Sequence, residues 1–91
     1  MEDFVPYETV LKLEKKGYKG KTIRYHGHIY DVLKWLREEK KLFVKICYYE
    51  YGYYYEVIDI ATAYVKVVST EYNSYEQAAL AGIQHTLDNL I

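Results

Sequence analysis

The chain has 91 residues, of which 51% are hydrophobic and 27% are charged, and its formal net charge is −1 at pH 7. This length predicts a single domain over residues 1–91, and the composition is that of a folded rather than a disordered protein. No apolar run approaches the roughly 20 residues that cross a bilayer, and the first residues lack the apolar core of a secretory signal. The single cysteine, Cys47, allows no intrachain disulfide, so we expect a cytoplasmic protein that does not associate with membranes.

The charged residues are unevenly distributed. Residues 1–45 carry eleven Lys/Arg and seven Asp/Glu, whereas residues 46–91 carry Lys66 alone against six acids. Most of the basic excess lies in residues 12–24. Such a segment can attract an anionic partner, although lysines are also favoured at the end of a helix by the helix dipole. The candidate anion contacts are Lys12, Lys15, Lys16, Lys19, Lys21 and Arg24.

The first predicted helix spans residues 6–16. Tyr7, Val10 and Leu11 form an apolar stripe at helical spacing, and Gly17 supplies a left-handed stop. Residues 19–28 then form a glycine-punctuated connector, with a short extended piece at 22–25.

The second predicted helix spans residues 30–40. Its stripe repeats at helical spacing and consists of Ile29, Val32, Leu33 and Leu36.

Tyrosine dominates the segment that follows, because six of the thirteen tyrosines lie between Tyr48 and Tyr55. We predict strands over 42–50 and 53–60, joined by a turn at Tyr51-Gly52. In this register the numbers of facing residues sum to 103, which pairs Ile46 with Val57, Cys47 with Glu56, Tyr48 with Tyr55 and Tyr49 with Tyr54. One face of the hairpin is then apolar and the other mixed, as in a half-buried sheet.

A third strand is predicted over residues 64–71, with Val65 and Val67 on one face. The last helix opens with the capping box Ser74–Gln77, in which a hydroxyl and an amide three residues later satisfy free N–H groups. Its apolar stripe consists of Ala79, Ile83, Leu87 and Leu90.

The sequence therefore predicts an α+β fold with the order α-α-β-β-β-α, in which a three-stranded antiparallel meander packs against helices. The mixed face of this sheet would leave many apolar groups exposed, and exposed apolar patches usually mark contact surfaces. Either the helix at 6–16 covers this face or a partner does. The candidate protein-contact residues on it are Phe43, Tyr49, Tyr54 and Ile58.

Few residues suggest catalysis or metal binding. His26 and His28 could share a metal, but a zinc site needs three or four protein ligands, and no spacing assigns Cys47 or His85 to it. In the predicted register Cys47 faces Glu56, which disfavours a reactive thiolate. No phosphate-binding loop and no hydrolase or zinc-protease motif occurs. We therefore expect no cofactor, no metal and no enzymatic activity.

The α-β-β-β-α order is that of the double-stranded-RNA-binding domain, which residues 53–90 resemble loosely. In that family the start of the last helix carries lysines that contact phosphates. The matching stretch here, Ser74–Leu80, has Glu76 and no lysine. The remaining nucleic-acid candidate is the basic segment 12–24, with its tyrosines as stacking platforms.

Several phrases resemble a group of small uncharacterised proteins of gut-bacterial genomes and of the phages and mobile elements that these carry. The shared pattern is a "YEQAL…LK…GF" opening, a "WLREK" helix, an aromatic hairpin and a closing "YEQA" helix. The matching segments here are Tyr7–Leu13, Val32–Glu39, Tyr54–Val57 and Tyr75–Ala78, although Pro6 replaces the usual Ser or Thr. The resemblance implies an accessory protein and transfers no catalytic residue.

Two functions follow as expectations. The first is a non-enzymatic protein-interaction module, forming a homodimer or binding another protein through the mixed sheet face. The second is weak nucleic-acid binding through residues 12–24, whose affinity would fall steeply with salt.

Overall fold

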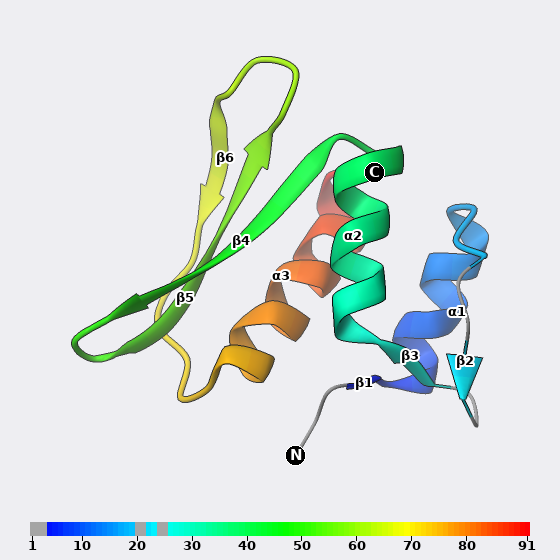
Figure 1. Cartoon of the computed structure of the whole chain (residues 1–91), viewed down its shortest axis with the longest axis horizontal. Coiled ribbons are helices and arrows are strands. Elements are labelled where there is room, and N and C mark those ends of the chain that lie inside the picture. The colour runs from blue at the N-terminus through cyan, green and yellow to red at the C-terminus, as the bar shows by residue number, and fades with distance from the viewer. Residues whose placement is uncertain (1–3, 20–21, 24–25) are drawn as a thin grey trace.

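The computed structural model describes residues 4–19, 22–23 and 26–91, without the side chains of 22, 23, 26 and 27. Within these residues the elements shown in Figure 1 are β1 (Phe4–Val5), α1 (Tyr7–Lys15), β2 (Thr22–Ile23), β3 (His26–His28), α2 (Ile29–Glu39), β4 (Leu42–Tyr49), β5 (Gly52–Asp59), β6 (Val65–Val68) and α3 (Tyr75–Asn89). The predicted α+β fold, with its antiparallel meander of β4, β5 and β6 packed against helices, is confirmed.

Helix α1 buries a different stripe from the predicted one. Its buried side chains are Thr9, Val10 and Leu13, whereas Tyr7 and Leu11 are exposed. The predicted stripe is therefore wrong at two of its three positions. The reason is tertiary: α1 packs against β3 and α3, and this contact selects the face that contains Val10 and Leu13.

The end of α1 is formed as predicted. Gly17 adopts a φ of +100°, which favours glycine, and it is followed by the buried Tyr18. The Tyr18 N–H donates to the carbonyl of Leu13 at 3.0 Å, and its ring meets Trp35 of α2 edge to face. The chain thus folds back over the last turn and ties α1 to α2.

A second, small sheet was not predicted. β3 lies between β1 and β2 in an antiparallel arrangement, with Val5 opposite Gly27 and Thr22 also opposite Gly27. The predicted extended piece coincides with β2 at 22–23, while 24–25 lie outside the described residues. Strands of two or three residues are too short to show a periodicity, which explains why the sequence pattern missed them.

Helices α2 and α3 lie on the same side of the sheet of β4, β5 and β6, and α1 lies beyond them (Figure 1). The core between these layers contains Leu36 of α2, Val44 and Val57 of the sheet, and Ile83 of α3, all buried. None of the helices in the described part of the chain combines the length and apolar character of a membrane span.

The start of α3 has the predicted cap with one difference. The Ser74 hydroxyl accepts a hydrogen bond from the Gln77 N–H at 3.1 Å. The Gln77 side chain, however, accepts from the N–H of Asn73 rather than from that of Ser74. The stripe of Ala79, Ile83 and Leu87 is buried, as predicted.

The register of the central hairpin differs from the prediction by two residues. The turn is at Glu50-Tyr51, and Gly52 pairs with Tyr49 as the first residue of β5. Gly52 is needed for a close approach instead: a Cβ there would lie 2.5 Å from the carbonyl oxygen of Tyr72. A shift of two keeps every side chain on its assigned face but changes its partners, so that the pairs are Val44 with Val57, Lys45 with Glu56, Ile46 with Tyr55, Cys47 with Tyr54 and Tyr48 with Tyr53.

Strand β6 is shorter than the predicted 64–71 and irregular. Val57 pairs with Val67, but the next residue, Ile58, pairs with Val65, so the pairing skips Lys66. This irregularity moves Val65 to the face of Ile58, where half of its surface is exposed (50%). The prediction that Val65 and Val67 share a face is therefore wrong.

Candidate functional site

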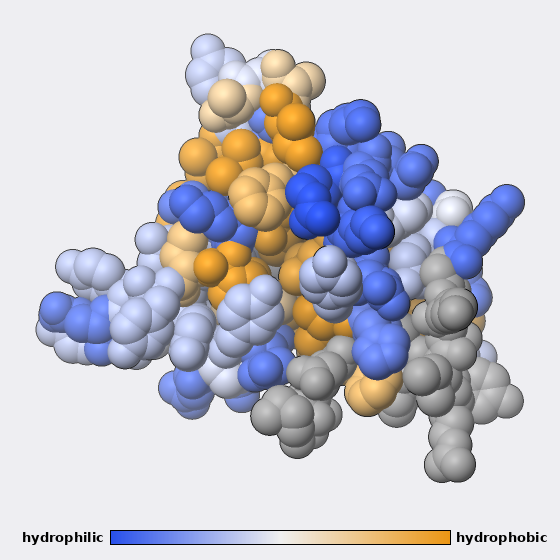
Figure 2. Space-filling view, viewed as in Figure 1, coloured by the Kyte–Doolittle hydropathy of each residue, from blue (hydrophilic) through white to orange (hydrophobic). Residues whose placement is uncertain are grey.

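The face of the β4–β6 sheet turned away from α2 and α3, hereafter the open face, is not covered by any described helix (Figure 1). Helix α1 packs against β3 and α3 instead, so it does not cross to this side. Figure 2 shows hydrophobic residues gathered over these strands, beside the hydrophilic surface of α2. Of the two predicted arrangements, coverage by the first helix is thus excluded.

The predicted protein-contact residues all belong to the open face. Phe43 is 36% exposed and Tyr49 is 57% exposed, while Tyr54 and Ile58 are half-buried. Phe43 and Ile58 are direct cross-strand partners, whereas Tyr49 faces Gly52 and not Tyr54 as predicted. The bulge in β6 adds Val65 to this surface, which sequence parity alone had assigned to the other side.

Cys47 and Tyr54 form the central cross-strand pair of the open face. The predicted pairing of Cys47 with Glu56 is wrong because of the register shift: Glu56 faces Lys45 instead of the thiol. The side chain of Cys47 forms a hydrogen bond that raises the pKa of Tyr54. The free thiol is half-buried, and its neighbours on the open face include the cross-strand pair Lys45 and Glu56 as well as Tyr54.

A shallow groove of about 510 Å³ runs over the β5–β6 side of the open face. Tyr49 and Tyr54 form its aromatic part, and Glu56 and Glu71 are its charged residues. Its other lining residues are Val68, Ser69 and Thr70. The groove is wide open to solvent, so this part of the face is close to flat.

Tyr48, Tyr53 and Tyr55 of the hairpin lie on the helix-facing side, whereas Tyr51 is in the exposed turn. Tyr53 meets both Tyr48 and Tyr75 edge to face, at centroid distances of 5.1 and 6.4 Å. Tyr55 is buried, and its ring stacks with Tyr72 at 6.2 Å. Burial raises the pKa of Tyr55, with a smaller effect from Tyr72. Such aromatic pairs contribute about 0.5–1.5 kcal/mol beyond the area that they bury.

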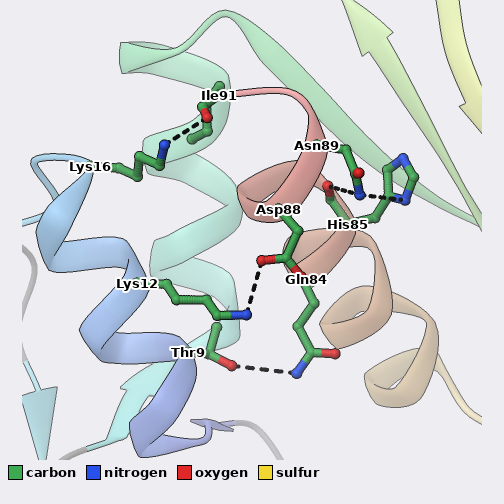
Figure 3. A network of polar contacts seen from close by, with 8 residues as sticks. All are labelled: Thr9, Lys12, Lys16, Gln84, His85, Asp88, Asn89 and Ile91. Atoms are coloured by element: carbon green, nitrogen blue, oxygen red, sulfur yellow. Dashed lines mark hydrogen bonds and ion pairs between the residues drawn. The ribbon is translucent and has the colours of Figure 1, made fainter.

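The predicted anion-contact residues are only partly free. Lys12 forms an ion pair with Asp88 at 2.9 Å, and Lys16 donates to the carbonyl oxygen of Ile91 at 2.7 Å (Figure 3). Nearer the start of α1, the side-chain amide of Gln84 in α3 donates to the Thr9 hydroxyl. The two lysines therefore join α1 to α3. Lys15 and Lys19 are exposed, and Lys21 and Arg24 lie outside the described residues.

The histidines of the predicted metal candidate lie in β3. The ring of His28 packs against Phe4, with ring centroids 4.6 Å apart. The side chain of His26 lies outside what the structure describes. Among the described side chains, no three His, Cys, Asp or Glu residues gather where they could hold a metal ion.

No family model matches this chain, and neither the curated proteins nor the solved structures include one that is significantly similar to it. The likeness to the double-stranded-RNA-binding domain therefore remains one of element order, from α2 through β4–β6 to α3.

Proposed function

We propose that the protein is a non-enzymatic interaction module whose contact surface is the open face, and that its first partner is a second copy of the chain. The observation that carries this proposal is that no helix of the described residues covers a face that exposes Phe43, Tyr49 and Val68. Association that removes this apolar surface from water would gain about 25 cal/mol per Å² buried. The resemblance to small accessory proteins is consistent with such a role.

The size of the face limits the strength of the contact. Strands of eight residues and a width of three strands correspond to a rectangle of about 26 by 14 Å, or about 360 Å². A stable homodimer usually buries about 800 Å² on each copy. We therefore expect a weak, concentration-dependent association.

The proposal is tested by measuring the molar mass by sedimentation equilibrium over a range of concentrations. The mass of the wild type should rise with concentration, and Tyr49→Ser with Tyr54→Ser should hold it at the monomer value without loss of the fold. A matched control, Tyr30→Ser with Tyr48→Ser, removes two tyrosines outside the open face and should leave the association unchanged. A wild type that stays monomeric, or a double variant with unchanged association, would refute self-association through this face.

Cys47 provides a second measurement on the same surface. If two copies meet through their open faces, a short thiol-to-thiol crosslinker should join them through Cys47, the single cysteine of the chain. Crosslinking should disappear in the Tyr49→Ser, Tyr54→Ser variant. Equal crosslinking in that variant would indicate random collision instead of a specific contact.

Weak nucleic-acid binding through residues 12–24 is the second candidate, supported by the exposure of Lys15 and Lys19. The engagement of Lys12 and Lys16 with α3 reduces the number of cations available to phosphates. Binding to a mixed-sequence oligonucleotide should weaken steeply with salt and be lost in Lys15→Glu with Lys16→Glu. Binding that survives this change would exclude the segment.

A further inference from the structure

Strand β4 has an unpaired backbone edge. In β5, the N–H groups of Tyr53 and Asp59 donate to Tyr72 and Tyr64, which places the odd-numbered residues of β5 toward β6. The backbone groups of its even-numbered residues therefore point toward β4, where they form hydrogen bonds with the odd-numbered residues of β4. The N–H and C=O groups of Val44, Ile46 and Tyr48 consequently point away from the sheet, and no hydrogen bond joins them to the described residues.

From Lys45 to Tyr49 this edge lacks the devices that usually block strand addition, whereas Val44 before it is only 3% exposed. β4 runs for eight residues in unbroken register with β5, contains no proline and carries one charge, Lys45. The opposite edge, β6, is only four residues long and irregular. Short strands, bulges and charged or proline residues protect sheet edges from pairing with other chains. The two edges of this sheet therefore differ, and only β4 offers a continuous template.

A groove follows the β4 edge. One part, of about 260 Å³, lies between α2 and β4 and reaches Tyr75 of α3. An adjoining part, of about 290 Å³, shares Tyr30, Leu33 and Tyr75 with it. Tyr30 and Tyr75 are exposed, and Ile46 of β4 is half-buried. A strand paired with β4 would direct alternate side chains into this aromatic and apolar groove.

The charges along the groove define the chemistry of its occupant. Arg37 from α2 and Lys45 from β4 are the charged residues lining the first part, and both are basic. A second copy of β4 cannot complement them, because Lys45 is the only charge of that strand. An acidic side chain or a terminal carboxylate of a different chain can. The second part of the groove contains Glu76, so the occupant needs its negative group at the Arg37 end.

We propose that the β4 edge and its groove bind an extended segment of another protein, with alternating apolar side chains and an acidic group between Arg37 and Lys45. Backbone hydrogen bonds to Ile46 and Tyr48 supply part of the affinity, and the groove selects the side chains. This site borders the open face, with which it shares Phe43 and Lys45, and it does not depend on self-association. It adds a second kind of partner to the proposed interaction module.

The probe is a set of linear peptides selected from a displayed random library against the full chain and then synthesised. Selected peptides should alternate apolar residues and carry an acidic residue near one end. In two-dimensional amide NMR spectra they should shift the amides of Ile46 and Tyr48 and slow the hydrogen exchange of both. Peptides without this pattern, or shifts confined to Tyr49 and Tyr54, would overturn the proposal.

Removing the backbone N–H of Tyr48 is the most direct test of strand addition. Tyr48→Pro removes an N–H that is not used in pairing with β5, and proline is tolerated at such edge positions. Tyr48→Ala removes the same side chain but keeps the N–H. The proline variant should bind about tenfold more weakly than the alanine variant, as expected for one lost hydrogen bond. Equal affinity of the two folded variants would contradict strand addition at β4.

A charge exchange tests the chemistry independently of the proline variant. Arg37→Glu should weaken binding of the acidic peptide about tenfold, and a peptide with lysine at the acidic position should recover it. Lys34→Glu, on a side of α2 that lines a different groove, is the matched control and should have no effect. If the lysine peptide does not regain affinity for the Arg37→Glu variant, the acidic group of the occupant does not lie at Arg37.

The two proposals can be separated. Tyr49→Ser with Tyr54→Ser should abolish self-association and leave peptide binding intact. If the Tyr48→Pro variant instead has a lower molar mass than the associated wild type, a second copy occupies the β4 edge. The proposal of a segment from another protein is then wrong.

Discussion

Helix α3 crosses the sheet so closely at Gly82 that this position should not tolerate a side chain. A Cβ there would lie 2.7 Å from Val44 Cγ1 and 3.1 Å from Tyr55 Cγ, whereas relaxed carbon contacts are about 3.5–4.0 Å. Val44 is β-branched and buried, so it cannot rotate away. Alanine in a helix interior is otherwise favoured over glycine by about 1 kcal/mol. Overpacking typically costs about 1–3 kcal/mol, so after the gain in helix propensity we expect Gly82→Ala to destabilise the protein by up to about 2 kcal/mol.

Urea or thermal unfolding followed by circular dichroism measures this effect. The melting temperature should fall by about 4–8 °C for each kcal/mol. Val44→Ala removes the clashing methyl groups, so the double variant should be less destabilised than the sum of the two single variants. A rise in melting temperature in Gly82→Ala would show that helix propensity acts unopposed and that the close approach is wrong.

Three further changes test the hairpin, the helix cap and the buried tyrosines. Gly52→Ala should destabilise by about 1–3 kcal/mol in urea unfolding, since its Cβ would meet the Tyr72 carbonyl. Gly17→Ala should cost less, because no atom lies within 4 Å of its Cβ, and equal costs would contradict the clash. Ser74→Ala should cost about 1 kcal/mol by removing the acceptor for the Gln77 N–H, and Ser74→Asp should not. The contribution of Tyr55 to stability should be constant below about pH 9 and fall as the pH rises past about 10, because burial raises the pKa of Tyr55 above its unfolded value. Tyr55→Phe should reduce that slope by up to about 1.4 kcal/mol per pH unit, while Tyr64→Phe, at an exposed position, should not.

Local signals in the sequence were sufficient for most of the helix ends and for the strand faces. The stop at Gly17 and the cap at Ser74 depend on hydrogen bonds within a few residues, so their pattern is visible in the chain itself. The alternation of side chains from Leu42 to Asp59 likewise assigned Phe43, Tyr49, Tyr54 and Ile58 to one face. This assignment survived a register error of two residues, because side chains in a strand alternate with a period of two.

Contacts between distant segments decided the rest. The position of the turn depends on the approach of Tyr72 to Gly52, and the face of Val65 depends on a bulge against β5, neither of which leaves a local signal. The sequence by itself determined that the sheet has an apolar second face. Only the tertiary structure decided that this face is open, because α1 packs on α3 and β3. The predicted meander order already makes β4 an edge strand, but only the tertiary structure shows that no described strand pairs with its outer edge.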